Sequence, residues 1–380
     1  MELLRCVAMM MIVVLHYLGK GGLLADVTGQ TSDLFRIAAW IPEALSMVAV
    51  NLYMLLSGYF GWKSSFRLSR LIRSYLQIWF YSAVIGMMAF VVWGYPQDTS
   101  GTYFFLILLF PVAMKHYWFM TAYIFLYLLL PVLNPVLRRL NRKQFGVAAV
   151  LLFFAFCLVK SVLLVRLEMD QKGYSVLWYL CLYVCGAYMG RFGNFDEEGA
   201  EGSLKRAIVR RKGICIYFAG TLGCLAELFL LNRIYIRTGK LSGMINVSTD
   251  YNHFFVFAAS VGLFLCFANL RVEGVIANVI IKIAPYTLGG YLLHENVVVR
   301  YLWPKWLGTE RVTNISTLFL HLICAVIAVF ITGVFTDFLR AALEKAVHRG
   351  LGKIPLYRLL TEKIQQLDEI MREEMTSGSR

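Results

Sequence analysis

The first hydrophobic segment of the chain carries two ionisable residues, Arg5 and His16, eleven positions apart. In an α-helix, eleven residues make three turns plus about 20°, so both side chains lie on one face, separated by roughly 16 Å along the axis. A permanent cation at one level and a titratable imidazole at another could hold an anionic cofactor at one end and react at its other end. The alternative is structural, with a snorkelling arginine and a hydrogen-bonded core histidine.

A second group of cations follows the second hydrophobic segment, within the sequence SGYFGWKSSFRLSRLIR from Ser57 to Arg73. Arg70 and Arg73 have the i, i+3 spacing of a helix and Arg67 lies one turn earlier, so three guanidinium groups share one side of a helix start. Guanidinium groups bind phosphates in a bidentate manner. We therefore expect an anion-binding site here. For any one of these arginines, positive charge that sets membrane orientation is the alternative.

The composition indicates a membrane protein. Of the 380 residues, 59% are hydrophobic and 16% are charged, whereas about a quarter of the residues in a soluble domain are charged. The hydrophobic residues form ten segments, each near the roughly 17 to 25 residues that cross a bilayer as a helix: 3–19, 37–60, 71–95, 116–137, 144–165, 175–192, 213–232, 252–270, 285–303 and 314–338. We therefore predict an all-α fold, a polytopic bundle of about ten transmembrane helices.

The basic residues predict how this bundle is oriented. Lysines and arginines cluster at 63–73, 138–143 and 205–212, and such clusters stay on the cytoplasmic side of a membrane. The run Tyr103–Met114 is too short to cross, and counting it as a crossing would put one cluster outside. We expect it to form a short re-entrant or interfacial helix on the outer side, with both termini cytoplasmic. The formal charge of +14 is then explained by orientation and membrane lipid headgroups, so we expect no nucleic-acid partner.

The chain divides into a membrane domain, 1–340, and a C-terminal tail, 341–380, which we expect to be cytoplasmic and amphipathic. One predicted helical face of the tail carries Leu360, Ile364, Leu367 and Ile370, which indicates a helix on the membrane surface or an oligomer contact, such as a homodimer. The eight cysteines lie in or beside hydrophobic segments and form no CxxC pair. We therefore predict neither a disulfide framework nor a metal site.

Five short motifs follow one another along the membrane domain. They are Arg5-x10-His16, Ser57-Gly58-Tyr59-Phe60, Arg70-Leu71-Ile72-Arg73, His116-Tyr117-Trp118-Phe119 and YTLGGYLLH from Tyr286 to His294. In this order they resemble the acyltransferase family 3 membrane proteins, which O-acylate cell-surface glycans. Many glycan-modifying members continue the fourth motif with Ser-Leu-x-x-Glu, where this chain has Met120-Thr121-Ala122. This difference leaves the acceptor undefined.

The resemblance implies a multi-pass, membrane-bound O-acyltransferase of a bacterial inner (cytoplasmic) membrane. It implies an acyl-CoA donor, expected to be acetyl-CoA, that enters from the cytoplasm. The implied acceptor is a hydroxyl of an exported saccharide or a lipid-linked glycan. Residues carried over to the donor site are Arg5, Arg70, Arg73, Arg67, Ser57 and Tyr59, and the first three of these would bind the phosphates of CoA.

His16 is then the general base that deprotonates the acceptor, or a transient acyl carrier. Glu227 lies deep in a predicted span, where it would orient a base or bind the acceptor; a paired structural carboxylate is the alternative. Tyr291 and His294 match the last motif and are expected at the acceptor; for His294, a structural role as a hydrogen-bonding residue is the alternative. Glu295 is adjacent to His294, so the two side chains point roughly 100° apart and should not both face one site squarely.

His116 and Trp118 lie at the outer start of a predicted span. Their rings could contact a sugar, and anchoring of the helix at the membrane interface is the alternative explanation for such residues.

Two rival functions remain open. A small-solute or proton-coupled transporter could use Arg5, His16 and Glu227 as a relay, although the chain lacks the internal repeat typical of transporters. An acyltransferase for a non-sugar small molecule would carry the same motifs.

Overall fold

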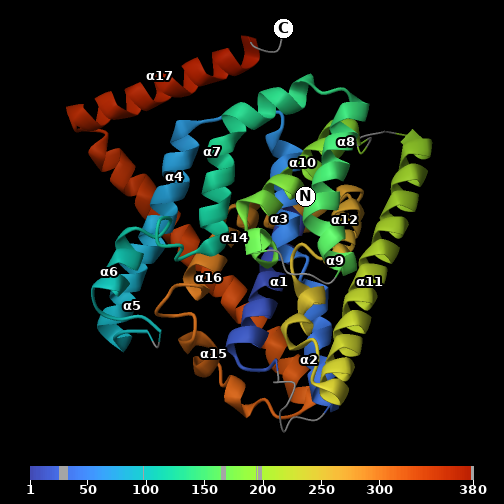
Figure 1. The fold of residues 1–380 in the computed structure, drawn as a ribbon. Coiled ribbons are helices and arrows are strands. Elements are labelled where there is room, and N and C mark those ends of the chain that lie inside the picture. Colours follow the sequence, from blue (N-terminus) through green and yellow to red (C-terminus); the bar gives the residue numbers. More distant parts are fainter. Residues whose placement is uncertain (25–32, 97, 164–167, 194, 196–198, 378–380) are drawn as a thin grey trace.

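The computed structural model describes residues 1–24, 33–96, 98–163, 168–193, 195 and 199–377, and within them the regular structure is helical, with no strand. The all-α prediction is confirmed. The elements run in this order (Figure 1): α1 Glu2–Lys20, α2 Asp33–Ser46, α3 Ala49–Gly61, α4 Leu68–Trp79, a π-helical turn Phe80–Ile85, α5 Gly86–Trp93, α6 Gly101–Leu109, α7 Trp118–Arg139, α8 Arg142–Phe153, a π-helical turn Phe154–Leu158, α9 Val159–Leu163, α10 Val176–Phe192, α11 Gly199–Thr238, α12 Phe254–Ala268, α13 Gly274–Ile283, α14 Thr287–His294, α15 Leu302–Trp306, α16 Ile315–Leu351 and α17 Pro355–Ser377.

In the described part of the chain, nine helical stretches are long and apolar enough to cross a membrane: Glu2–Lys20, Asp33–Gly61, Leu68–Trp93, Trp118–Arg139, Arg142–Leu163, Glu201–Thr238, Ser242–Ala268, Gly274–His294 and Ile315–Leu351. The apolar helix α10 is shorter and adds a tenth. The chain is therefore a multi-pass membrane protein, as predicted. The short run predicted to stay on one side, Tyr103–Met114, overlaps α6, Gly101–Leu109. The nine residues of α6 rise only about 14 Å and cannot cross a bilayer.

One predicted span is displaced. The expected segment 285–303 does not form a single helix, because α14 ends at His294 and the chain turns before α15. Asn296 fixes this turn: its Nδ2 donates to the carbonyl oxygen of Tyr81, 2.8 Å away. The spanning stretch is instead Gly274–His294. It is interrupted at Ala284–Tyr286 by Pro285, which cannot donate a backbone hydrogen bond.

Glycines allow two pairs of helices to touch backbone to backbone. A Cβ on Gly58 of α3 would lie 2.0 Å from the carbonyl oxygen of Tyr183 in α10. A Cβ on Gly333 of α16 would lie 2.2 Å from Cα of Gly290 in α14. Small residues at such positions are how membrane helices approach closely. The second contact fixes α14, which carries the last sequence motif, against α16.

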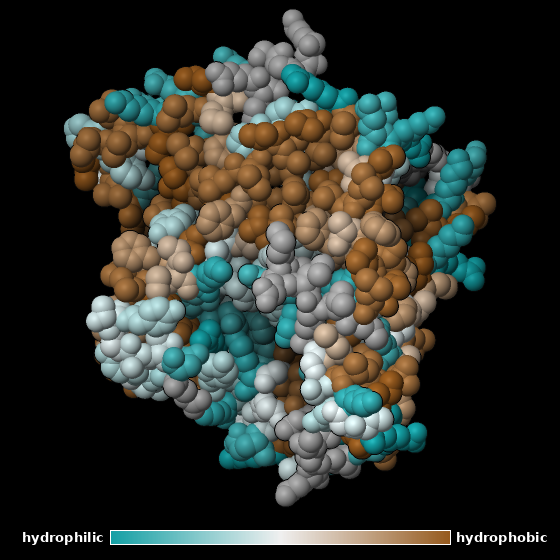
Figure 2. Space-filling model, viewed as in Figure 1, coloured by the Kyte–Doolittle hydropathy of each residue, from teal (hydrophilic) through white to brown (hydrophobic). Residues whose placement is uncertain are grey.

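The outer surface is suited to lipid. Large apolar side chains are exposed on several helices, for example Val91, Val132 and Val162 at 77%, 72% and 70%. On the face shown in Figure 2, hydrophobic side chains cover most of the surface, and hydrophilic ones gather around a hollow in the lower half of the view. Helices that are apolar on their outward side belong in a bilayer.

Two of the predicted basic clusters, 63–73 and 138–143, meet at one end of the bundle. Arg138, at the end of α7, donates to the carbonyl oxygens of Trp62 and Ser64 (3.0 and 3.1 Å), so the loops after α3 and α7 are neighbours. We call this end of the bundle the basic end. Helix α17 lies across it (Figure 1). Helix α16 continues through residue 340, the predicted domain boundary, and ends at Leu351.

Candidate active site

A cavity of about 550 Å³ lies between α1, α3, α7 and α14. Its wall on α1 consists of Arg5, Met9 and Ile12, whose spacing of four and three residues puts them on one helix face. Ser57 and Arg70 belong to the same lining at the basic end. Ligand pockets have volumes of about 300–1,000 Å³ and combine apolar walls with a few polar groups. This space, which we call the inner cavity, meets both criteria.

Arginines gather where the inner cavity meets the basic end. Arg5 forms an ion pair with Glu2 at 2.7 Å, and Arg70 lines the cavity from the first turn of α4. Arg67 and Arg73 are exposed on the same helix start and lie outside the cavity lining. Among the described residues, no carboxylate forms an ion pair with Arg67, Arg70 or Arg73. An anion with several charged oxygens could bind across these groups.

The SGYF motif faces two directions. Ser57 and Phe60 line the inner cavity, and the Ser57 hydroxyl donates to the carbonyl oxygen of Tyr53 at 2.7 Å. Tyr59 does not line the cavity. Its ring packs against Phe264 of α12, with centroids 5.4 Å apart. Successive helical residues point about 100° apart, so the motif cannot turn all of its side chains to one ligand.

A second cavity of about 510 Å³ lies nearer the opposite end of α1, and we call it the outer cavity. It contains His16 and a mixture of charged and aromatic side chains: Glu43, Lys172, Asp250, Trp118, Tyr174 and Tyr251. The aromatic rings form one surface, since the centroid of Trp118 is 4.2 Å from that of Tyr174 and 5.8 Å from that of Tyr251.

Two helices, α1 and α7, line the inner cavity with one set of residues and the outer cavity with the next. Phe119 and Tyr291, with ring centroids 5.9 Å apart, close the inner cavity, and the ring of Tyr291 lies 6.3 Å from that of His16. The change of cavity takes place within a few residues, from Ile12 to His16 in α1 and from Phe119 to Trp118 in α7. Helix α14 lies beside this level, since His294 binds His16. A group at the end of the inner cavity is therefore next to His16.

The hydrogen bonds of His294 fix the proton positions on His16. His294 Nδ1 lies 2.5 Å from the carbonyl oxygen of Gly290, which can only accept, so this nitrogen carries a proton. In a neutral ring, His294 Nε2 is then an acceptor. It lies 2.7 Å from His16 Nδ1, so His16 donates from Nδ1. The lone pair of His16 is consequently on Nε2, which makes no hydrogen bond to any described residue.

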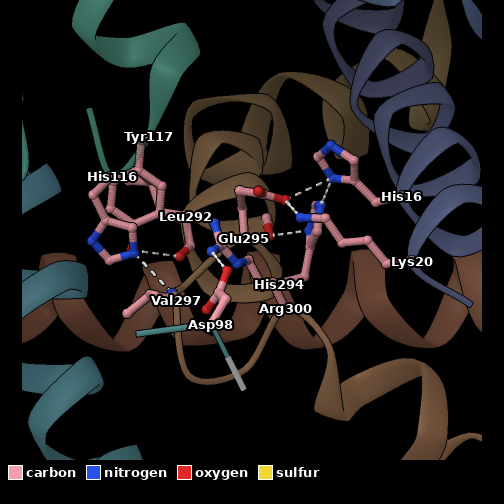
Figure 3. A network of polar contacts seen from close by, with 11 residues as sticks. His16, Lys20, Asp98, His116, Tyr117, Leu292, His294, Glu295, Val297 and Arg300 are labelled. Atoms are coloured by element: carbon pink, nitrogen blue, oxygen red, sulfur yellow. Dashed lines mark hydrogen bonds and ion pairs between the residues drawn. The ribbon is translucent and has the colours of Figure 1, made fainter. Parts of the chain in front are cut away.

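Glu295 and Lys20 complete the group around His16 (Figure 3). A carboxylate oxygen of Glu295 lies 3.2 Å from His16 Nδ1, and the ammonium group of Lys20 binds the same oxygen. The expectation that His294 and Glu295 cannot both face one site is wrong. It assumed a continuous helix, whereas α14 ends at His294 and the backbone of Glu295 departs from the helical path. The carboxylate is placed to stabilise a positive charge that forms on His16.

His16, His294 and Glu295 could also hold a metal ion, since their ligand atoms all lie within 4.8 Å of one another. The ammonium group of Lys20, however, already supplies a positive charge at Glu295. His16 Nδ1 and His294 Nε2 are hydrogen-bonded to each other, and Glu295 is paired with Lys20, an arrangement that fits a positioned base.

Glu227 lies apart from His16. Its carboxylate is 3.3 Å from Nε2 of the buried His253, and it lines neither cavity. Helix α11, which carries Glu227, packs chiefly against α12. The position of Glu227 deep in a span was visible in the sequence, but the face it presents was not.

His116 is a buried connector between three segments. Val297 N–H donates to its Nε2 at 2.8 Å, so Nδ1 carries the proton and donates to the hydroxyl of Ser82, also 2.8 Å away. Ser82 in turn donates to the carbonyl oxygen of Ile107. His116 precedes α7, outside the spanning helices, and burial lowers its pKa to about 3, with smaller contributions from Arg300 and Lys20. Its two ring nitrogens are thus used within the protein, whereas the neighbouring Trp118 lines the outer cavity.

Sequence patterns did not identify several residues of this site. These are Glu295 and Lys20 beside His16, and Glu43, Tyr174, Asp250 and Tyr251 in the outer cavity. A signal for Lys20 did exist, because it follows His16 by four residues and therefore lies on the same face one turn later.

Comparison with known proteins gave a family match. Residues 1–336 match the family model described as an acyltransferase domain. No curated protein and no solved structure matches the chain.

Proposed function

We propose, from the premise that this chain belongs to the acyltransferase family 3, that it transfers an acetyl group from acetyl-CoA across the membrane to a hydroxyl of a saccharide. Membership makes the chain a membrane acyltransferase. The identity of the donor, the acceptor and the roles of individual residues are the substance of the proposal.

The inner cavity supports a CoA thioester as the donor. Arg70 and the partly paired Arg5 face it near the basic end, where the phosphates of CoA would bind. The apolar lining deeper in the cavity, including Met9 and Ile12, suits the pantetheine arm. The roughly 16 Å between Arg5 and His16 along α1 is of the same order as an extended pantetheine. Arg67 and Arg73 would add to the attraction of the donor without touching it in the cavity.

The outer cavity supports an acceptor that approaches from the other side. Trp118, Tyr174 and Tyr251 offer aromatic faces beside His16, and such rings have an apolar face with a polar edge that suits a sugar. Glu43 and Asp250 in the same cavity can accept hydrogen bonds from hydroxyl groups. We infer that the acceptor is an extracytoplasmic or lipid-linked saccharide, and that the membrane is a bacterial inner membrane.

In the proposed reaction, His16 acts as a general base. Its Nε2 lone pair takes the proton of the acceptor hydroxyl while the oxygen attacks the thioester carbon. The C–S bond breaks, the ester forms, and the proton on His16 Nε2 passes to the departing CoA thiolate. Glu295, 3.2 Å from His16 Nδ1, stabilises the imidazolium during this interval. The hydrogen bond from Nδ1 to His294 keeps Nε2 deprotonated at the start.

One observation carries this proposal: His16 lies at the level where α1 and α7 pass from an inner cavity with cations to an outer cavity with aromatic rings. The test uses the detergent-solubilised full chain. Acetyl-CoA should raise the thermal midpoint of unfolding of this protein, and the His16→Ala variant should show the same rise. The variant should however no longer transfer acetyl groups to the envelope saccharides of the host, as measured by mass spectrometry. Full transfer by His16→Ala would overturn the role of this residue.

A matched variant separates donor binding from chemistry. Arg70→Ala should weaken the stabilisation by acetyl-CoA, whereas Arg233→Ala, on the far part of α11 beside Asp33, should leave it unchanged. Stabilisation by small solutes, with none by acetyl-CoA, would favour a transporter instead.

A further inference from the structure

The phenol of Tyr291 stands between the two cavities and is not used by the reaction described so far. Tyr291 is 2% exposed and lines the inner cavity at its closed end. Its ring is 6.3 Å from that of His16 and 6.1 Å from that of His294. The ring of Phe119 lies 5.9 Å away in an edge-to-face arrangement, so the position of the phenol is fixed by packing on both sides.

The hydroxyl of Tyr291 has a proton with no acceptor. The hydroxyl is buried and hydrogen-bonds to none of the residues that the structure describes. A buried hydroxyl without its hydrogen bond destabilises the folded protein, and such a group in a native site calls for an explanation.

We propose that the Tyr291 hydroxyl donates a hydrogen bond to the carbonyl oxygen of the donor thioester and stabilises the oxyanion that forms there. This inference rests on the proposed function. When the acceptor oxygen bonds to the thioester carbon, the electron pair of the C=O bond moves to oxygen, and the Tyr291 O–H faces that negative charge. When the C–S bond breaks, the pair returns and the carbonyl re-forms. The proton stays on Tyr291 throughout, and His16 carries the proton of the acceptor.

The position of Tyr291 favours this role over acceptor binding. A catalytic hydrogen bond has to reach the reacting carbonyl from a direction other than that of the base. Tyr291 belongs to the lining of the inner cavity, while His16 belongs to that of the outer cavity. A thioester carbonyl at the closed end of the inner cavity therefore meets Tyr291 from the inner side, while an acceptor activated by His16 approaches from the outer side.

The first test is Tyr291→Phe, which removes only the hydroxyl. We expect kcat to fall by about 100-fold, the usual loss for one oxyanion donor, with KM for acetyl-CoA little changed. Tyr179→Phe is the matched control, since Tyr179 is also a fully buried tyrosine with an unpaired hydroxyl, and it lines neither cavity. Unchanged kcat in Tyr291→Phe, or equal losses in both variants, would overturn the assignment.

The second test reads the hydrogen bond directly. The probe is a ketone analogue of acetyl-CoA, with a methylene group in place of sulfur and a ¹³C label in the carbonyl. Infrared spectroscopy of the bound probe should show a lower carbonyl frequency in the wild-type protein than in Tyr291→Phe. Equal carbonyl frequencies in the two proteins would refute the role of Tyr291 and leave the proposed donor site standing. Failure of the wild-type protein to bind the probe, measured first, would instead overturn the proposed donor site and this inference with it.

Discussion

His16 and His294 lie 278 positions apart in the chain, yet Nδ1 of the first is 2.7 Å from Nε2 of the second. The contact sets which nitrogen of His16 is a base, because His294 is itself held by the carbonyl oxygen of Gly290. The close approach of α14 to α16 at Gly290 and Gly333 holds that carbonyl in place. Helix packing thus controls a proton position in the candidate site.

Replacing His294 should therefore impair chemistry more than donor binding. In His294→Phe, His16 Nδ1 loses its acceptor and His16 can take up the other tautomer, with its proton on Nε2. We expect kcat for acyl transfer to fall by about 100-fold or more, the range typical of general-base catalysis, while KM for acetyl-CoA stays near the wild-type value. His348→Phe is the control, since His348 is exposed near the end of α16 and bonds to Tyr357. A wild-type kcat in His294→Phe would contradict the positioning role.

Phe119 should limit the size of the acyl group. It closes the inner cavity together with Tyr291, and its ring centroid lies 5.9 Å from that of Tyr53. In Phe119→Ala, the freed space should accept a longer chain, so the ratio of kcat/KM for butyryl-CoA to that for acetyl-CoA should rise by about tenfold. This estimate counts two additional methylene groups at about 0.8 kcal/mol each. Phe125→Ala, on the same helix but half exposed towards the lipid side, should leave the ratio unchanged, and an unchanged ratio in Phe119→Ala would refute the prediction.

His116 should make the folded protein sensitive to acid. Histidine normally has a pKa of about 6.5, whereas burial holds the pKa of His116 at about 3. Between these values the unfolded chain binds a proton that the folded chain does not, so the free energy of unfolding decreases as pH falls through this window. In His116→Gln, whose amide can still donate and accept, the thermal midpoint should fall less than in the wild-type protein between about pH 7 and pH 5. The other histidines are common to both proteins, so an identical fall would contradict the assignment.

Local sequence patterns were sufficient for the spans but not for their ends. Hydropathy found ten segments because lipid exposure acts on each helix separately, as the exposed valines of α5 and α7 illustrate. The break after His294 was missed, since it depends on the bond from Asn296 to Tyr81, 215 positions away. Glu295 reaches His16 only because of that break.

The spacing of the motifs likewise predicted how far along its helix each residue lies better than it predicted which way the side chain points. Arg5, Arg70 and His16 line the cavities. Arg5 and His16 lie on one helix, so their spacing alone shows that they share a face. Tyr59 and Glu227 lie on helices whose rotation is set by neighbours, here Phe264 and His253. Single-helix geometry cannot supply that rotation.

The C-terminal helix should stabilise the helix that carries Arg70. The carboxylate of Asp368 in α17 accepts hydrogen bonds from the backbone N–H groups of Leu68 and Ser69 (2.5 and 3.3 Å) and from the Ser69 hydroxyl. These are the first residues of α4, whose own N-cap residue, Arg67, provides no side-chain hydrogen bond. Asp368 therefore caps α4 from 300 positions away.

Asp368→Ala should lower the free energy of unfolding by about 1 kcal/mol, the usual value of an N-cap, and release α17 from the basic end. Faster cleavage by trypsin in the turn 352–354, between α16 and α17, would report the release, because Lys353 lies in that turn. Glu369→Ala removes an adjacent exposed carboxylate and should leave the cleavage rate unchanged. Since a cap also orients the first turn that carries Arg70, Asp368→Ala should raise KM for acetyl-CoA. Equal cleavage rates in the two variants would show that the contact does not hold α17 in place.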